Sequence, residues 1–193
     1  MDEKTESGHC SQLRTLILYW SATGNTRKVA EAIERGAMNA GSEPVVVPIK
    51  DAGDVELHDF DLVFIGCPSY SFLPPEPVLR YVRQKMSHHR DRGDIRPQAP
   101  KLPGKKAVVF VTYSGPHTGI AEATPVGAYL GQFLAHLGFD VVDEWYVVGE
   151  FHGNEELSTL GCLGDIRGRP NEEDLSRVEG QAEALVRRCA QMA

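Results

Sequence analysis

The sequence lacks the features that would direct the protein into a membrane, into a secretory route or onto nucleic acid. No apolar run approaches the roughly 20 residues that span a bilayer, and residues 1–13 are polar and acidic, without the apolar segment of a secretory signal. Basic residues are in deficit, with 20 Lys and Arg against 27 Asp and Glu and a formal net charge of −7. Because nucleic acid binding needs a basic surface, we expect a cytoplasmic protein with neither membrane nor nucleic acid as its partner.

A cysteine-based metal centre is also absent from the sequence. The four cysteines contain no C-x-x-C pair, which excludes the usual zinc and iron–sulfur spacings and predicts free thiols in a reducing compartment. They are Cys10, Cys67, Cys162 and Cys189. His88 and His89 are adjacent in a charged segment, so we expect them to be solvated and to form no metal site.

Short apolar runs alternate with helical patterns along the chain. Apolar side chains three and four residues apart predict a helix between successive strands and another after the last strand. Thr124 before Pro125 is expected to cap one helix, and Asn171 the last one. The expected strands are 16–20, 45–47, 62–65, 107–111 and 141–148.

Five strands that alternate with helices predict a doubly wound α/β domain, with a parallel sheet covered on both faces. Pro44 and Pro48 flank the second strand, and proline cannot donate to a ladder, so this strand belongs at an edge. The order 2-1-3-4-5 satisfies these constraints. In such sheets ligands bind beyond the carboxyl ends of the strands, where the order reverses.

The expected organisation is one domain. Residues 1–13 are interpreted as a polar tail and residues 14–193 as the domain. Polar segments at about 87–105 and 150–170 are interpreted as exposed insertions. Three roles are possible for the second segment: it covers a bound ligand, it forms a surface for a partner, or it is an insertion without a role in cofactor binding.

The loop after the first strand has the chemistry of an anion site. Ser21-Ala22-Thr23-Gly24-Asn25-Thr26 combines hydroxyls, small residues and a glycine just before a helix. Backbone N–H groups and the positive end of the helix dipole can hold a phosphate there. The alternative is a capped turn that binds nothing. Neither G-x-x-x-x-G-K-[ST] nor a strand followed by G-x-G-x-x-G occurs, which excludes the common nucleotide motifs.

This hexapeptide resembles the T/S-x-T-G-x-T phosphate loop of flavodoxins, and the resemblance extends from about residue 14 to the last helix. It implies FMN as cofactor, with the flavin ring between the loops after the third and fourth strands. Aromatic side chains there can stack on the ring. His117 could donate a hydrogen bond or a proton to it, or could face solvent. The expected FMN-binding residues are Ser21, Ala22, Thr23, Gly24, Asn25, Thr26, Pro68, Ser69, Tyr70, Ser71, Phe72, Thr112, Tyr113, Ser114, Gly115, His117 and Gly119.

Two functions follow from this resemblance, and no catalytic residue is assigned for either. The first is an FMN-binding electron carrier that acts between redox partner proteins. The second is an NAD(P)H-dependent FMN oxidoreductase of the quinone-reductase kind. Electron-carrier flavodoxins usually surround the ring with acidic residues, yet 67–75 and 112–119 contain neither Asp nor Glu. A flavin-free interaction module is a third alternative, against which the intact phosphate loop argues. The redox potential and the oligomeric state remain open.

Overall fold

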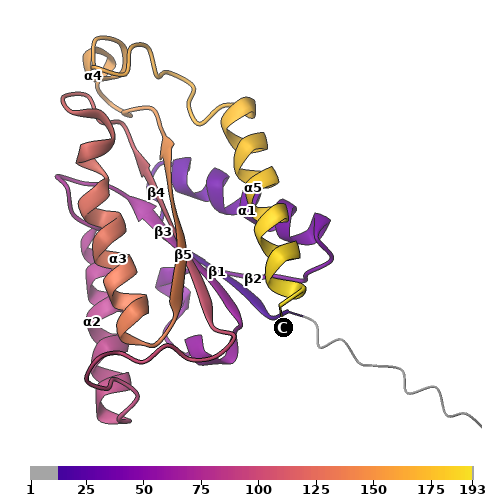
Figure 1. The fold of residues 1–193 in the computed structure, drawn as a ribbon. Coiled ribbons are helices and arrows are strands. Elements are labelled where there is room, and N and C mark those ends of the chain that lie inside the picture. Colours follow the sequence, from indigo (N-terminus) through magenta and orange to yellow (C-terminus); the bar gives the residue numbers. More distant parts are fainter. Residues whose placement is uncertain (1–12, 193) are drawn as a thin grey trace, which may run out of the picture.

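A computed structural model describes residues 13–192. A five-stranded parallel sheet forms its centre, in the order β2-β1-β3-β4-β5 (Figure 1). This confirms the predicted fold class and strand order. The strands are β1 (Thr15–Tyr19), β2 (Val45–Pro48), β3 (Leu62–Pro68), β4 (Lys106–Tyr113) and β5 (Asp140–Val148).

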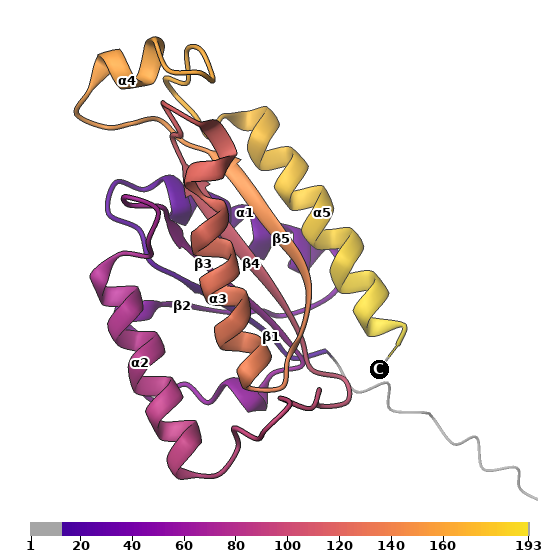
Figure 2. The same ribbon diagram turned by 60° about the vertical axis from the view of Figure 1, so that its left-hand side comes forward.

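Helices cover both faces of the sheet. Helices α1 and α5 lie on one face and α2 and α3 on the other (Figures 1 and 2). The short α4 lies beyond the carboxyl edge of the sheet, at the top of both views. The helices are α1 (Asn25–Asn39), α2 (Glu76–Asp91), α3 (Thr124–His136), α4 (Glu155–Thr159) and α5 (Glu172–Ala190), with short 3-10 turns at Ile49–Asp51, Leu57–Asp59 and Gly119–Glu122.

Each face of the sheet carries its own hydrophobic core. On one face, Val29 and Ile33 of α1 and Val178 of α5 pack over Ile17 and Phe64. On the other, α2 and α3 bury apolar side chains over Leu16, Ile65 and Val109. Successive side chains of a strand point to opposite faces, so buried parallel strands become apolar throughout. This explains why the strands appear in the sequence as continuous apolar runs.

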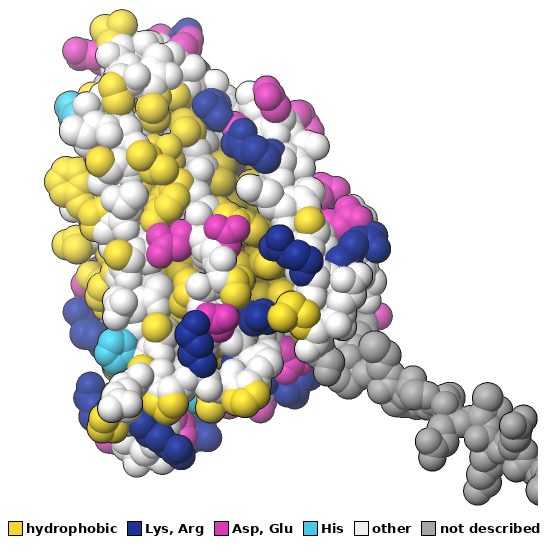
Figure 3. All heavy atoms as spheres, viewed as in Figure 1, with side chains coloured by type: hydrophobic (Ala, Val, Ile, Leu, Met, Phe, Trp, Pro, Cys, Tyr) yellow, Lys and Arg dark blue, Asp and Glu magenta, His cyan; other side chains and the backbone are white. Residues whose placement is uncertain are grey.

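The two edges of the sheet are protected in different ways. Strand β2 pairs with β1 alone and carries Pro48, as the flanking prolines predict. At β5 the register with β4 shifts past Val142, which introduces an irregularity. Acidic side chains interrupt the hydrophobic surface over β5 (Figure 3), and Asp143 and Glu144 are exposed there. Charges and bulges of this kind discourage pairing with another strand.

Helix α2 is longer than its sequence predicts. Residues 87–91, interpreted as the start of an exposed insertion, form its last turn. The buried face of the helix continues through Lys85 and His89, which follow Tyr81 and Val82 at helical spacing. Because two polar residues occupy these core positions, the apolar pattern stops one turn before the helix does. The expectation that His89 is solvated is therefore wrong.

Three smaller expectations can be compared with the structure. Asn171 caps α5 in a capping box with Asp174, as predicted. Thr124 does not cap α3: it is the first helical residue, Ala123 holds the cap position, and the Thr124 hydroxyl donates to the carbonyl of Ala121. Leu13, assigned to the tail, is buried in the core, while the rest of that tail and Cys10 lie outside the described residues. Within residues 13–192, no helix has the length and apolar character needed to cross a bilayer.

Candidate functional site

A cavity of about 590 Å³ opens at the carboxyl edge of the sheet. Four segments line it: the loop after β1, the loop after β3, the loop after β4 and the start of the segment after β5. The position agrees with the general placement of ligands in open α/β sheets, beyond the strand ends at the reversal of strand order. The cavity therefore brings together the three loops that the sequence singled out, and it adds a fourth.

The first wall of the cavity is the start of α1. Gly24 takes the cap position with φ of 104°, a conformation that favours glycine, and no side chain caps the helix. The first N–H groups of a helix have no partner within it, so those of α1 are available to a ligand. Ser21 Oγ accepts the N–H of Gly24 at 3.1 Å, which holds the turn. The exposed Ala22 and Thr23 leave the loop accessible, so the geometry fits an anion such as a phosphate.

The next two residues tie this wall to other strands. Thr26 is buried, and its hydroxyl lies 2.7 Å from that of Thr112 at the end of β4. The amide of Asn25 donates to the carbonyl of Glu150 at 3.1 Å, and its carbonyl oxygen lies 3.3 Å from His152 Nε2. A side chain at Gly149 would collide with Asn25, since a Cβ there would lie 2.7 Å from its amide nitrogen. These contacts fix the loop before any ligand arrives.

The second wall is a tight turn after β3. Tyr70 and Leu73 exchange two backbone hydrogen bonds of 3.0 Å. Between them, Ser71 and Phe72 have φ values of 48° and 69°. Both values lie in the left-handed region, which residues other than glycine rarely adopt. The turn holds the aromatic ring of Phe72 in solvent at the mouth of the cavity, 54% exposed. Trp20 supports the ring of Tyr70 edge-on at 5.9 Å between centroids.

The third wall is the loop after β4, which contains an unexpected carboxylate. Glu122 Oε1 accepts the backbone N–H groups of His117 and Thr118 at 2.8 and 2.7 Å. Ser69 Oγ, in the loop after β3, donates to the backbone carbonyl of Glu122 at 2.5 Å. Residues 67–75 and 112–119 themselves contain no Asp or Glu. The adjacent 3-10 turn nevertheless supplies a negative charge to the cavity.

The fourth wall belongs to the segment after β5. Gly149, Glu150, Phe151, His152 and Leu157 line the cavity. The segment contains the short helix α4, and Cys162 donates its N–H to the carbonyl of Pro116 at 2.9 Å. The long loop at 150–170 is thus part of the cavity wall. A cover over a bound ligand was one of the three alternatives for this segment, and its position at the cavity agrees with that alternative.

The expected binding residues separate into two groups. Apart from two glycines, all of them line the cavity. Gly24 lines a smaller adjoining hollow of about 360 Å³, and Gly119 faces the side chains of Cys162 and Leu163. Sequence reasoning missed Pro116, Glu122 and the residues of the fourth wall.

Two tyrosines that line the cavity favour their neutral forms. Burial raises the pKa of Tyr70 and of Tyr113, which keeps both phenols protonated and able to donate hydrogen bonds. Burial also raises the pKa of the Cys67 thiol at the end of β3. Cys67 is fully buried, which agrees with a structural thiol and not a reactive one.

A comparison with protein families assigns this architecture. The family model described as flavodoxin matches residues 17–177, which include most of β1 and all four segments that line the cavity. The chain belongs to the flavodoxin family. The resemblance carried by residues 21–26 is thereby confirmed at the level of the family.

The relatives include flavodoxins and NAD(P)H dehydrogenases (quinone). A flavodoxin of Clostridium beijerinckii is 28% identical over 97 residues, which is 50% of this chain and 62% of that protein. An NAD(P)H dehydrogenase (quinone) of Archaeoglobus fulgidus is also 28% identical, but over 209 aligned positions that cover 93% of this chain and 97% of the relative. A solved structure described as a flavodoxin, WrbA-like protein from Agrobacterium tumefaciens superposes on this chain with a TM-score of 0.62 at 15% identity. The superposition covers 94% of this chain and all of that protein, which shows that the two share a fold.

Proposed function

We propose that the chain binds FMN in this cavity and uses it to transfer electrons. The observation that carries the proposal is the uncapped start of α1, which opens into the same cavity as the loops after β3 and β4. The phosphate belongs on residues 21–26. The flavin ring belongs between the aromatic turn of Tyr70 and Phe72 and the loop that begins at Tyr113.

The charges in the cavity favour a phosphate held by hydrogen bonds. Among the described residues that line it, none is Lys or Arg. Backbone N–H groups, the Ser21 and Thr23 hydroxyls and the helix dipole therefore have to hold the phosphate. Each hydrogen bond to a charged group contributes about 1.5–3 kcal/mol. Several of them suffice for tight binding without a basic side chain or a metal.

As the first functional assignment, we propose an electron carrier of the flavodoxin type. The bound FMN supplies the redox chemistry, and the protein residues position it and set its surroundings. Tyr70, Phe72 and Leu73 are each about half exposed at or beside the cavity mouth, where a redox partner protein could approach the ring. The charge of Glu122 supports this function, because a negative group near the ring disfavours the anionic reduced flavin.

A second candidate is an NAD(P)H-dependent oxidoreductase that acts on quinones. The observation in its favour is the extent of the alignments. The quinone dehydrogenase of Archaeoglobus fulgidus aligns over nearly its whole length, whereas the Clostridium beijerinckii flavodoxin aligns with half of this chain.

Two measurements on the FMN-loaded protein distinguish these functions. Stepwise reduction should pass through a persistent one-electron-reduced flavin if the protein is a carrier. Steady-state oxidation of NADH or NADPH with a soluble quinone should then be negligible. Direct two-electron reduction with rapid NAD(P)H-dependent quinone turnover would replace the carrier by the reductase. Failure to retain any flavin would contradict both.

A further inference from the structure

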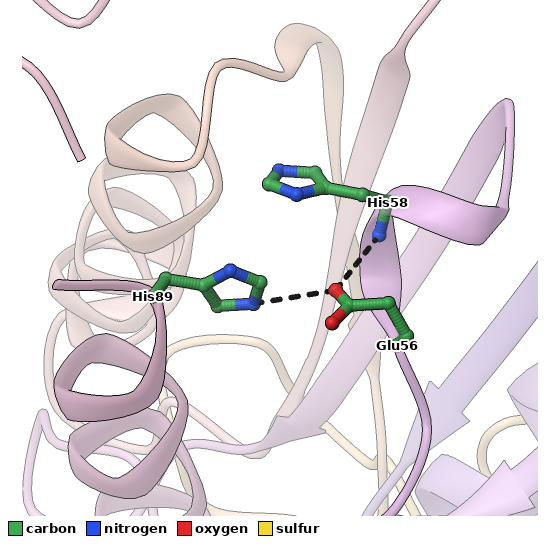
Figure 4. A group of neighbouring side chains, drawn as sticks. All are labelled: Glu56, His58 and His89. Carbon is green, nitrogen blue, oxygen red and sulfur yellow. Dashed lines mark hydrogen bonds and ion pairs between the residues drawn. The ribbon is translucent and has the colours of Figure 1, made fainter. Parts of the chain in front are cut away.

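Two histidines and a glutamate converge at the edge of the sheet opposite to the cavity. Glu56 and His58 precede β3, and His89 lies in the last turn of α2, which leads toward β4 (Figure 4). Each contributes one oxygen or ring nitrogen, and the three atoms lie within 4.8 Å of one another. His89 Nε2 is 3.6 Å from Glu56 Oε1. The cluster is therefore separate from the proposed FMN site.

The hydrogen bonds of the two histidines determine which nitrogen carries the lone pair. His89 Nδ1 lies 2.9 Å from Asp94 Oδ2, and His58 Nε2 lies 2.8 Å from the carbonyl oxygen of Leu137. Both partners only accept, so these nitrogens carry the protons. In the neutral rings, Nε2 of His89 and Nδ1 of His58 are left with lone pairs. An acceptor behind each histidine is the arrangement that orients metal-binding imidazoles.

A buried polar atom in the cluster has no hydrogen-bond partner among residues 13–192. The side chain of His89 is 1% exposed, and its Nε2 has only the 3.6 Å approach to Glu56 Oε1, which is too long for a hydrogen bond. A buried nitrogen without a hydrogen-bond partner lowers the stability of the folded state, and such atoms are rare in native structures.

From these contacts we propose a binding site for a divalent transition metal of the zinc class, with His58 Nδ1, His89 Nε2 and Glu56 Oε1 as its ligands. Two imidazoles and a carboxylate suit Zn²⁺, whose bonds to nitrogen and oxygen measure about 2.0–2.2 Å. Tetrahedral ligands at that length lie about 3.3 Å apart. Binding therefore requires the three ligand atoms, now within 4.8 Å of one another, to move closer together, and a water molecule would take the fourth position.

The surroundings of Glu56 limit the affinity. Its Oε1 already accepts the backbone N–H of His58 at 3.3 Å, which leaves a second lone pair for a metal. Its Oε2 accepts from Arg92 at 2.5 Å and lies 3.7 Å from His88 Nε2. The Arg92 guanidinium neutralises part of the carboxylate charge, which weakens its attraction for a metal ion.

The bound metal would connect the loop before β3 to the end of α2.

Zinc titration of the chelator-treated, full-length chain against a chromophoric competitor tests this site. We expect one equivalent of Zn²⁺, with affinity at least about tenfold weaker in Glu56→Gln and His89→Gln. Asp94→Asn tests the supporting contact and should also weaken binding by about tenfold or more. His136→Gln, which removes an exposed histidine of α3, is the matched control and should bind as the parent does. Co²⁺ should give the absorption of a tetrahedral complex in the parent and in His136→Gln, but not in Glu56→Gln or His89→Gln.

Two results would overturn the proposal. One is the absence of stoichiometric zinc binding; the other is binding of equal strength in the parent and in Glu56→Gln, which would locate the ion on exposed histidines. Circular dichroism and FMN titration check the fold of each variant. If His89→Gln does not fold, Glu56→Gln and a ¹⁵N spectrum of the histidine rings decide, because Zn²⁺ must shift His58 Nδ1 and His89 Nε2. Since FMN binds at the opposite edge, this outcome is independent of the proposed redox function.

Discussion

The side chain of Asn25, the first residue of α1, donates a hydrogen bond to the backbone carbonyl of Glu150, 125 positions further along the chain. This bond joins the phosphate loop to the segment after β5, and His152 contacts the same side chain. The outermost wall of the cavity is thus held by the loop that we propose to bind the FMN phosphate. Binding of FMN and order in residues 149–152 should therefore be coupled.

The variant Asn25→Ala tests this coupling. Loss of the bond should destabilise the segment by about 1 kcal/mol and increase amide exchange in residues 149–152. FMN affinity should fall at the same time. Asn39→Ala is the matched control, because Asn39 ends the same helix and its side-chain amide donates to Glu179, away from the cavity. Equal FMN affinity in both variants would show that the wall and the loop act separately.

The charge of Glu122 should lower the reduction potential of the bound flavin. Glu122→Gln keeps an oxygen that accepts from His117 and Thr118 but removes the negative charge. We expect the midpoint potential to rise by an amount on the order of tens of millivolts at low ionic strength, and less at high salt. Potentiometric titration of both proteins measures the difference. An unchanged or lower potential would exclude Glu122 as a determinant.

Two helical glycines should respond to alanine with opposite signs. A Cβ at Gly36 would lie 2.2 Å from the carbonyl oxygen of Glu179 and 2.8 Å from Ala182 Cβ, where α1 packs against α5. Gly36→Ala should lower the free energy of unfolding by about 1–3 kcal/mol. A Cβ at Gly180 meets nothing within 4 Å, so Gly180→Ala should raise it by about 0.5–1 kcal/mol. Urea denaturation of the two variants checks both signs.

The buried His89 should make the metal-free protein less stable in acid. Its pKa is lowered in the folded state by burial, against an unfolded value of about 6.5. Below that value the unfolded chain binds a proton that the folded chain resists, so stability falls as the pH drops, by at most about 1.4 kcal/mol per pH unit. Charged or titratable groups near its ring are Asp94, Glu56, His58, His88 and Arg92.

Thermal unfolding between pH 7.5 and 5.5, with a chelator present, measures this slope. His89→Gln should flatten it, whereas the exposed His136→Gln should leave it unchanged. If the two variants gave the same slope as the parent, protonation of His89 would not be linked to folding.

The sequence predicts the helices and strands correctly where the buried positions are occupied by apolar residues. The apolar runs of β1, β3 and β4 and the flanking prolines of β2 were enough to establish the strand order. The end of α2 could not be found in this way, because Lys85 and His89 occupy buried positions. Lys85 is accommodated there by donating to the carbonyls of Gly53 and Val55, which come from a distant part of the chain.

The candidate site was predicted in its local parts and missed in its long-range ones. The proposed phosphate loop consists of consecutive residues, so it can be identified from the sequence alone. Glu122 joins the cavity because the 3-10 turn folds back on the loop after β4, and Glu150 joins it because β5 ends beside β4. The cluster of His58 and His89 depends on contacts between residues 31 positions apart, which no spacing in the sequence indicates.

The proposed FMN site is tested by the amount of FMN that the protein retains. Purified protein would be mixed with excess FMN, desalted and measured by its flavin absorption, beside the double variant Thr23→Val/Thr26→Val. We predict one FMN per chain in the parent protein and none in the variant, with the variant's fold verified by circular dichroism. Loss of all flavin from the parent, or equal retention by a folded variant, would contradict the proposal that residues 21–26 hold the FMN phosphate.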